Sequence, residues 1–430
     1  AAGWRGGDAR QAMIGALAAR GARLSVLLRN GTGRNIWARD ASACRRPWRR
    51  SRCRSPAAPA RRARRACTAA SVQSNATPGW VSAAPLPSAQ APAPLLVLVD
   101  GPAFVHQGFH GASELKNAKG EQTGAVLALL SKLHRIEREL RPSHIAVLMD
   151  TCAANGHRRK LYAGYKASRD ARPFPPELAR QLDTVYEACK AFGIACLARD
   201  GYEADDLIAT YAWEAQQFMH VRVVSPDKDL AQLVCDRVQV LHGDELAVLD
   251  REGVRKKWAV DPEQMGDFLA LSGDYSDNIP GVRLVGPMKA AALLREHGDL
   301  EAILAAANAG GSLGVPLVGP KTLENLRQPE WQEHVRTMRR IVALQRVPSV
   351  DAAAFVDEFR VPPKGEALLQ RRLGFCERED FARLAKRLAR QHRKAATAVA
   401  TATPSAEEQR LRDLVASPPS APVVVSLAAD

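Results

Sequence analysis

The sequence lacks the cysteine spacing of common metal and disulfide sites. Its eight cysteines include no Cys-x-x-Cys pair, which argues against zinc and against a disulfide framework and favours free thiols in a reducing compartment. No apolar run approaches the roughly 18 residues that a membrane-spanning helix needs. We therefore expect neither a zinc domain nor a membrane protein.

Acidic residues are nearly absent from the first 94 positions. This stretch holds 17 arginines, no lysine, no glutamate and only Asp8 and Asp40, so it carries the whole net charge of +15. Its composition predicts an organellar transit peptide over 1–70, for a chloroplast or a mitochondrion, and a Pro/Ala/Ser linker over 71–94. The alternative is a disordered basic arm that binds nucleic acid. The other 336 residues are neutral, with 44 basic and 44 acidic side chains.

Four apolar runs, each closely followed by acidic residues, organise the middle of the chain. The runs span 95–99, 144–149, 194–198 and 221–225. Continuous apolar runs indicate strands buried on both faces, and helical patterns such as 121–140 separate them. The alternation predicts an α/β domain over 95–260, with a mostly parallel central sheet and helices on both faces.

Carboxylates are predicted to gather at the carboxyl edge of this sheet, where ligands bind in such folds. Three of them lie within Gly201–Asp206, at the start of a helical pattern over 207–217. An acidic helix start that complements the helix dipole is the alternative explanation for that segment alone. Oxygen-only ligands favour Mg²⁺, or Mn²⁺, over zinc. The converging residues are Asp100, Asp150, Glu203, Asp205, Asp206, Asp227 and Asp229.

The second part of the chain is predicted to be helical. After a hairpin over 238–250, a short helix at 262–271 leads into a loop that adds Asp274 and Asp277. Gly281 and Gly286 then bend a helix–turn–helix-like element, which Leu317-Val318-Gly319-Pro320 repeats weakly. Gly-Pro at a helix start exposes N–H groups that can bind a phosphate, although two ordinary helix starts would look the same. Further helices are expected at 331–344, 365–373 and 380–390, which gives a helical subdomain over 261–392 and a disordered tail over 393–430.

These motifs identify a resemblance. Residues 95–350 resemble the 5′-nuclease domain of bacterial DNA polymerase I, in the flap-endonuclease superfamily with its PIN-like fold. The matching motifs are Val99-Asp100-Gly101, Tyr165-Lys166-x-x-Arg169, Gly201-x-Glu203-Ala204-Asp205-Asp206, Asp227-Lys228-Asp229 and Gly273-Asp274-x-x-Asp277-Asn278-Ile279-Pro280-Gly281-Val282.

The resemblance implies that all nine carboxylates serve divalent metals, normally Mg²⁺. Two metals about 4 Å apart activate a water and stabilise the leaving oxygen of a phosphodiester. Asp100 would lie between the two groups of ligands. The first group would be Asp150, Glu203, Asp205 and Asp206, and the second Asp227, Asp229, Asp274 and Asp277.

The resemblance also implies that the helical subdomain over 261–392 is a helix–hairpin–helix-type DNA-binding subdomain, and it implies which residues contact DNA. Lys166 and Arg169 would lie in a helical arch over about 152–192 and hold the scissile phosphate, as cations do in phosphoryl transfer. Leu284 stands where the family has glycine, which weakens the case for the family's monovalent-cation site in this hairpin. Leucine can still form the turn if its φ is negative. His157 stands where relatives usually have phenylalanine. Further DNA contacts are expected from Arg158, Tyr165, Lys228, Gly281, Val282, Gly286, Lys289 and Lys321.

The function that we expect is that of a metal-dependent 5′→3′ exonuclease or flap endonuclease. It would act as a stand-alone monomer on DNA with 5′ ends, flaps or junctions, in organellar replication or repair beside a polymerase and a ligase. A PIN-like ribonuclease acting on organellar RNA and a non-catalytic module that binds branched DNA are the alternatives. Because the working domain is neutral, a few local cations would make the phosphate contacts, and the affinity for DNA should depend only modestly on salt.

Overall fold

The computed structural model describes residues 94–401, apart from 152, 171–173, 244 and 349–351. The predicted transit peptide, nearly all of the predicted linker, and residues 402–430 of the predicted tail lie outside the described residues. None of the helices in the described ranges combines the length and apolar character needed to cross a membrane. Cys189, Cys196, Cys235 and Cys376 are free thiols.

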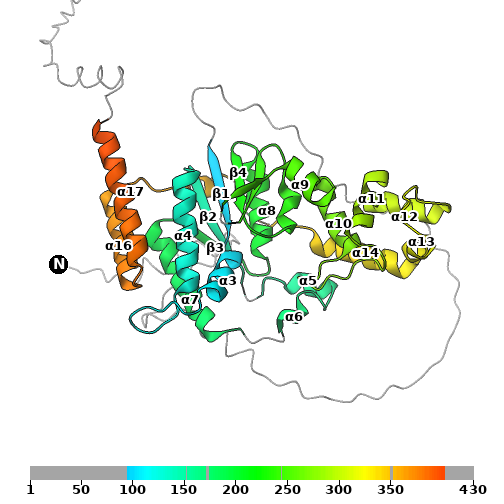
Figure 1. Ribbon diagram of the computed structural model, residues 1–430, viewed down its shortest axis with the longest axis horizontal. Helices are drawn as coiled ribbons and strands as arrows, with labels where there is room; N and C mark the ends of the chain where they lie inside the picture. Colours follow the sequence, from blue (N-terminus) through cyan, green and yellow to red (C-terminus); the bar gives the residue numbers. More distant parts are fainter. Residues whose placement is uncertain (1–93, 152, 171–173, 244, 349–351, 402–430) are drawn as a thin grey trace, which may run out of the picture. The chain divides into compact units, whose positions relative to one another are not determined.

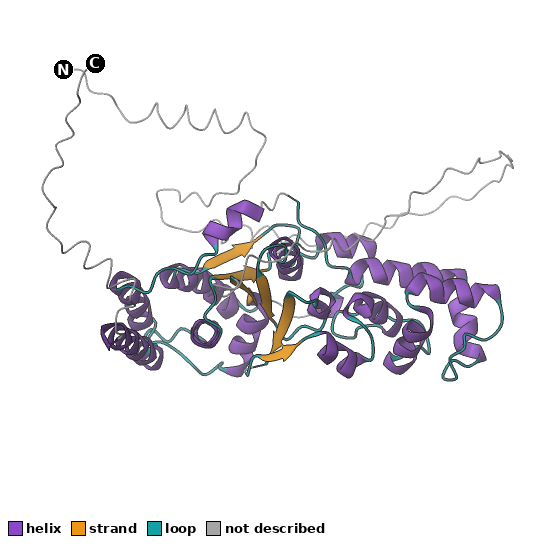
Figure 2. Cartoon of the chain, turned by 90° about the horizontal axis from the view of Figure 1, so that it is seen from above, coloured by secondary structure: helices purple, strands orange, loops and turns teal. Residues whose placement is uncertain are grey.

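The centre of the fold is a six-stranded sheet in the order β3-β2-β1-β4-β5-β6 (Figures 1 and 2). The first five strands are parallel, and β6 pairs with β5 in the antiparallel hairpin that the sequence predicts. The predicted parallel sheet is therefore confirmed. The strands are β1 (Leu95–Asp100), β2 (His144–Met149), β3 (Ala195–Ala198), β4 (His220–Val224), β5 (Val238–His242) and β6 (Ala247–Leu249).

Alternate residues of the strands enter two separate cores, because successive side chains in a strand point to opposite faces. Val97 and Val99 of β1 pack in one core with α3 (Gly101–Gly111), α4 (Gly124–Glu139) and α7 (Pro176–Phe192). Leu96 and Leu98 pack in the other core with α8 (Ala204–Ala215). Helices on both faces thus fix the carboxyl edge of the sheet in place.

Helix α3 is absent from the sequence-based prediction, because Asp100-Gly101-Pro102 looks like a turn. In the structure Asp100 is its N-cap, and the carboxylate accepts a hydrogen bond from the N–H of Ala103 at 3.2 Å. Pro102 occupies the first turn, where proline is tolerated.

The helical region begins with η2 (Pro262–Gln264) and α10 (Met265–Ser272). Helix α10 packs against both α11 and α14. The Gly-Pro helix starts expected from the sequence begin α11 and α13, with Gly286 and Gly319 as N-caps. The remaining helices here are α11 (Pro287–His297), α12 (Leu300–Ala309), α13 (Pro320–Arg327) and α14 (Pro329–Val342).

The C-terminal part of the predicted subdomain over 261–392 contacts the sheet, which the sequence-based prediction did not include. The N–H of Ile145 at the start of β2 donates to Phe359 O at 2.7 Å, and Val361 N–H donates to Ser143 O at 2.9 Å. After α15 (Ala352–Glu358), α16 (Glu366–Arg378) packs against α7.

The last helix, α17 (Ala382–Thr401), packs on α16 and runs past residue 393, where the sequence-based prediction placed a disordered tail. Ala395, Ala396, Ala398 and Ala400 explain the difference. Alanine has the highest intrinsic helix propensity, so the alanine-rich stretch continues the helix.

Candidate metal centre and nucleic-acid site

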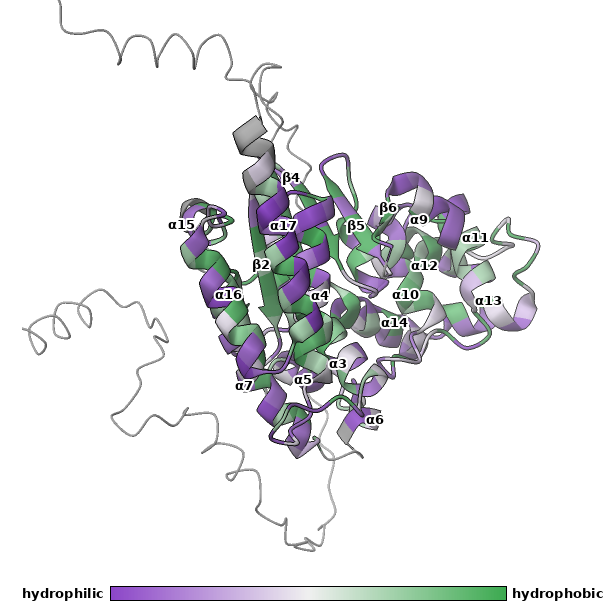
Figure 3. Cartoon of the chain, turned by 60° about the vertical axis from the view of Figure 1, so that its left-hand side comes forward, coloured by the Kyte–Doolittle hydropathy of each residue, from purple (hydrophilic) through white to green (hydrophobic). Residues whose placement is uncertain are grey.

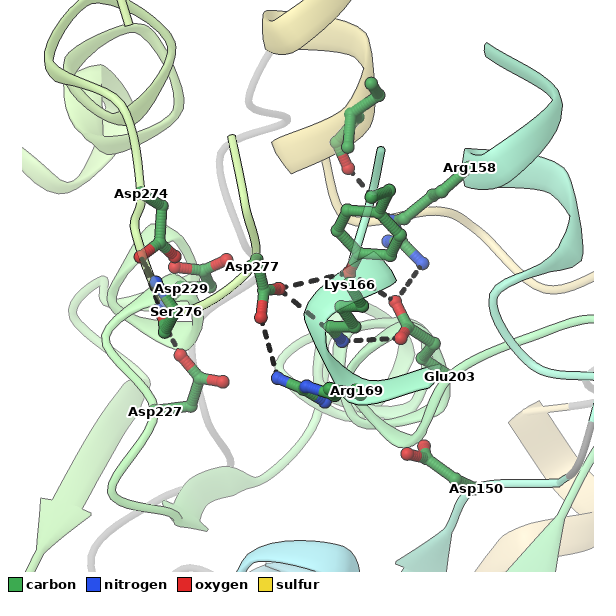
Figure 4. A network of polar contacts seen from close by, with 12 residues as sticks. Asp150, Arg158, Lys166, Arg169, Glu203, Asp227, Asp229, Asp274, Ser276 and Asp277 are labelled. Carbon is green, nitrogen blue, oxygen red and sulfur yellow. Dashed lines mark hydrogen bonds and ion pairs between the residues drawn. The ribbon is translucent and has the colours of Figure 1, made fainter. Parts of the chain in front are cut away.

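The acidic residues lie after strands, at the start of α8 and after α10; Figure 4 shows most of them. Asp100 ends β1, Asp150 follows β2 and Glu203 is the N-cap of α8. Asp227 and Asp229 follow β4, while Asp274 and Asp277 follow α10. Segments far apart in the sequence thus supply carboxylates to the same edge of the sheet.

Asp229, Asp274 and Asp277 have the geometry of a metal site. They offer three carboxylate oxygens that all lie within 4.8 Å of one another. Oδ1 of Asp229 is buried and finds no hydrogen-bond partner among the residues that the structure describes, and a buried acceptor left in this state is costly. A hard divalent cation with oxygen ligands fits these residues.

Neighbouring carboxylates and burial disfavour charge in this cluster. Partial burial raises the pKa of Asp229 well above its usual range, and the negative charge of Asp227 adds to this effect. Burial likewise raises the pKa of Asp205 well above its usual range, and Asp227 and Asp100 add to the effect. Burial raises the pKa of Asp100 to about 7, although Ser225 donates a hydrogen bond to it at 2.5 Å. A cation would reverse these shifts, since it favours the ionised form.

Glu203 is surrounded by donors from the Arg158–Lys166 segment. It accepts hydrogen bonds from Lys166 Nζ at 2.5 Å, from Arg158 at 2.7 Å and from the Tyr165 hydroxyl at 2.9 Å. Burial would raise the pKa of Glu203, but the charges of Lys166 and Arg158 lower it. Glu203 is thus ionised and held by this segment.

Asp277 shares two of these donors. The Tyr165 hydroxyl lies 3.2 Å and Lys166 Nζ 3.5 Å from its carboxylate, and Arg169 donates to it at 2.8 Å. The predicted phosphate-binding residues Lys166 and Arg169 therefore lie directly at the predicted metal ligands. Arg169 is the accessible one, with 58% of its side chain exposed.

Lys228 and Ser276 hold Asp274. Lys228 Nζ lies 2.8 Å from Asp274 Oδ2, and the Ser276 hydroxyl donates to Oδ1 at 2.7 Å. Although burial would raise the pKa of Asp274, these hydrogen bonds lower it. Ser276, like Ser225 beside Asp100, escaped the sequence-based prediction. Ser225 could have been predicted from its position two residues before Asp227, where a serine hydroxyl can accept a local backbone N–H. In the structure it accepts the N–H of Asp227 at 3.0 Å.

The structure does not place Asp206 as a free metal ligand, in contrast to the prediction. The residue is fully buried, and both carboxylate oxygens accept hydrogen bonds from Arg158. Oδ1 also accepts the N–H of Gln345 at 2.8 Å and Oδ2 the N–H of Glu203 at 3.2 Å. Both oxygens are therefore occupied by hydrogen bonds that stabilise the fold.

Arg158 and Tyr165 were predicted to contact DNA, and the structure buries both. Arg158 donates to Glu203, to Asp206 and to Ile341 O at the end of α14, the last at 2.9 Å. Burial would lower the pKa of Arg158, but the hydrogen bonds and charge of Asp206 raise it. Its guanidinium is thus a structural cation, and the Tyr165 hydroxyl is directed to carboxylates.

The predicted arch is shorter than the expected range 152–192. Helix α7 belongs to the core, where Leu178, Val185 and Phe192 are buried. The separate segment contains α5 (Gly156–Leu161) and α6 (Ala167–Asp170). Lys166 adopts φ 52° at its bend, and its N–H donates to Asp277 O at 2.9 Å. This bond fastens the segment to the metal-site loop.

The first hairpin differs from the prediction at three residues. Val282 is buried and its N–H donates to Leu271 O at 2.9 Å, so neither its side chain nor its N–H is available to DNA. A Cβ on Gly281 would lie 2.4 Å from the carbonyl carbon of Ser272, so this glycine permits close backbone packing rather than a phosphate contact. Leu284 adopts φ 67°, not the negative value expected.

The other hairpin residues remain near the surface. Lys289 Nζ donates to Leu284 O at 2.9 Å and to the hydroxyl of Thr322 at 3.1 Å, which joins the two Gly-Pro helix starts. Gly286 and Lys321 are exposed. Of the predicted DNA contacts in this region, these two are accessible.

Comparisons with known proteins agree with this architecture. A family model described as "5′-3′ exonuclease, N-terminal resolvase-like domain" matches residues 95–259. A second, "5′-3′ exonuclease, C-terminal SAM fold", matches residues 260–364.

Curated relatives match over about half of the chain. The 5′-3′ exonuclease of Aquifex aeolicus is 39% identical over 210 residues, which are 49% of this chain and 72% of that protein. The DNA polymerase I of Rhizobium leguminosarum is 40% identical over 218 residues, 49% of this chain but only 21% of the polymerase. Among solved structures, the flap endonuclease of bacteriophage T5 with DNA and metal ions has 22% identity and a TM-score of 0.49, and the match covers 66% of this chain and 98% of that one.

Proposed function

The chain belongs to the 5′-3′ exonuclease family, and we propose that it hydrolyses phosphodiesters of DNA at 5′ ends and flaps with the help of divalent cations. The observation that carries the proposal is the group of three carboxylate oxygens, one each from Asp229, Asp274 and Asp277, that lie within 4.8 Å of one another. The buried Oδ1 of Asp229, which has no hydrogen-bond partner among the described residues, adds to it. Stability alone gives no reason to bury like charges together.

Asp229, Asp274 and Asp277 would hold one cation, and Asp100, Asp150, Glu203, Asp205 and Asp227 lie on the same edge of the sheet to complete the centre. Mg²⁺ is the cation that we propose, with Mn²⁺ as a substitute, because the donors are carboxylate oxygens. Bound there, such a cation would activate water and stabilise the negative charge on the leaving oxygen.

The chain's own cations would position the substrate. Arg169 is mostly exposed and lies 2.8 Å from Asp277, so its guanidinium can bind a phosphate next to the metal centre. Lys166 is buried against Glu203 and Asp277, and these charges raise its pKa against the effect of burial, which keeps it protonated. Both would offset the charge that develops on the phosphate in the transition state.

The cellular setting is also part of the proposal. The arginine-rich, acid-poor composition of residues 1–70 supports import into an organelle. There the nuclease would remove primers or flaps beside a polymerase and a ligase. The match covers about a fifth of the length of the Rhizobium leguminosarum DNA polymerase I, and the proposal is confined to nuclease activity.

The test is cleavage of a 5′-labelled flap duplex with Mg²⁺ and with EDTA, beside single-stranded RNA of the same sequence. We expect metal-dependent cutting near the flap junction and weak cutting of the RNA. Preferential RNA cleavage would indicate a ribonuclease instead. Tight binding of the flap without cutting, in Mg²⁺ and in Mn²⁺, would indicate a non-catalytic module that binds branched DNA.

A further inference from the structure

Helix α17 carries only positive charge. It contains six lysines and arginines and no aspartate or glutamate over Ala382–Thr401. The six are exposed, and none of them forms an ion pair within the described part of the chain. They are Arg383, Lys386, Arg387, Arg390, Arg393 and Lys394.

Five of these six residues share one face of the helix. Relative to Arg383 they follow at positions i+3, i+4, i+7 and i+11, a spacing that aligns side chains along a helix. From Arg383 to Lys394 the helix rises about 16 Å. One strand of duplex DNA presents a phosphate about every 3.4 Å, so roughly five phosphates face this length. In Figure 3 hydrophilic colour runs along α17.

The opposite face of α17 is already used. Leu384 and Leu388 are 2% and 3% exposed and pack in the core that also contains Phe375 of α16. An amphipathic helix binds a bilayer by inserting its apolar face, and here that face is buried in the protein. The surface left for a partner is therefore polar and cationic.

Folding does not explain this surface, because like charges at i, i+4 destabilise a helix. No tryptophan, tyrosine or phenylalanine lies between Ala382 and Thr401, so the helix has no platform for stacking unpaired bases. The arrangement matches a duplex backbone better than a single strand. Helix α17 also lies outside the region that the two family models match, which ends at residue 364.

We propose that the exposed face of α17 binds the phosphate backbone of duplex DNA, as a second contact separate from the metal centre. The choice of DNA as the partner rests on the proposed nuclease function. The contact itself is independent of metal and of cleavage. It would add sequence-independent affinity to a working domain whose net charge is zero.

The test compares three full-length proteins: wild type, Arg383→Gln/Arg387→Gln/Arg390→Gln, and a matched control with Lys256→Gln/Arg295→Gln/Lys364→Gln. The control residues are exposed and lie outside α17, and the control loses the same net charge as the α17 variant. Affinity for a blunt DNA duplex is measured in EDTA over a series of salt concentrations. The arginines of residues 1–93 are common to all three proteins and cancel in the comparison.

For the α17 variant we expect a loss of at least about tenfold in affinity at low salt, and a slope of log K against log salt that is shallower by about 2.7. The control should keep the wild-type slope. A fourth protein, with Lys in place of the same three arginines of α17, should keep wild-type binding. Equal slopes for the α17 variant and the control would overturn the proposal. So would unchanged duplex binding together with lost binding to vesicles of anionic phospholipid, which would identify a lipid surface. If the wild-type protein did not cleave DNA but its duplex binding still depended on α17, the proposed nuclease function would be rejected and the α17 contact would stand.

Discussion

At the scale of single residues, Arg158 shows how the structure assigns a role that the sequence does not reveal. The family resemblance suggests a phosphate contact for Arg158, whereas its guanidinium is buried against Glu203 and Asp206. The backbone acceptors that complete its surroundings, Ile341 O and Ala343 O, lie more than 180 positions away in the chain. No local pattern could have predicted this burial. The acidic edge was predictable, because the end of each strand can be recognised from local sequence.

The first prediction concerns Arg158→Ala. Removal of this cation leaves Asp206 charged and buried without its partner, so the free energy of unfolding should fall by about 3–5 kcal/mol. Urea unfolding followed by circular dichroism measures the change. Arg169→Ala is the matched control, because its exposed ion pair should contribute less than about 1 kcal/mol. If the two variants were equally stable, Arg158 would not have the structural role assigned to it.

The second prediction concerns pH. The pKa of Asp100 is about 7 in the folded chain and about 3.9 when unfolded, so the folded state binds more protons between these values. In EDTA, stability should therefore fall as pH rises through this window, and Asp205 and Asp229 act in the same direction.

Added Mg²⁺ should consequently raise the melting temperature more at about pH 8 than at about pH 5, where protons occupy the carboxylates. Thermal unfolding with and without the metal tests this expectation. Asp100→Asn should flatten the pH dependence of the metal-free protein. A larger Mg²⁺ effect at the lower pH would contradict the assignment of these residues.

At the scale of elements, the Val- and Leu-rich strands were predictable because they are buried on both faces. Helix α3 was missed because Gly101-Pro102 favours a turn until Asp100 caps the helix. The extension of α17 was missed because its alanines follow a basic segment and carry no amphipathic pattern of their own.

The hairpin supplies the third prediction. Leu284 adopts φ 67° while 51% exposed, and a left-handed conformation costs a non-glycine residue roughly 1–2 kcal/mol. Leu284→Gly should therefore raise the free energy of unfolding by about 0.5–1 kcal/mol after the entropy of glycine is counted. The control is Leu317→Gly at the equivalent position of the second hairpin, which is 49% exposed and is not among the described residues with positive φ. That change should lower stability, as measured by urea unfolding. A loss of stability in both variants would refute the strain at Leu284.

At the scale of the whole molecule, the chain after α14 completes the nuclease fold. Arg372 of α16 donates to Glu137 of α4 at 2.7 and 2.8 Å and to Phe192 O at 2.8 Å. This contact joins segments 235 positions apart, which is why the sequence placed these helices in the wrong subdomain.

The fourth prediction is that truncation after residue 364 destabilises the protein, because it exposes the apolar core around Phe192 to water and removes Arg372, the ion-pair partner of Glu137. Truncation after residue 401 removes neither contact. Melting temperatures and soluble yields of the two proteins measure the difference. Equal values would show that α16 and α17 are not part of the folded unit.

The most direct test of the central claim is single-turnover cleavage of a 5′-flap duplex by Asp229→Asn, with exposed Asp357→Asn as the matched control. The account predicts that Asp229→Asn folds normally but loses at least about 100-fold in rate, because ligand loss weakens the metal site, while the control retains wild-type activity. Wild-type rates in Asp229→Asn at low and high Mg²⁺ would contradict the assignment of this carboxylate cluster as the catalytic metal centre.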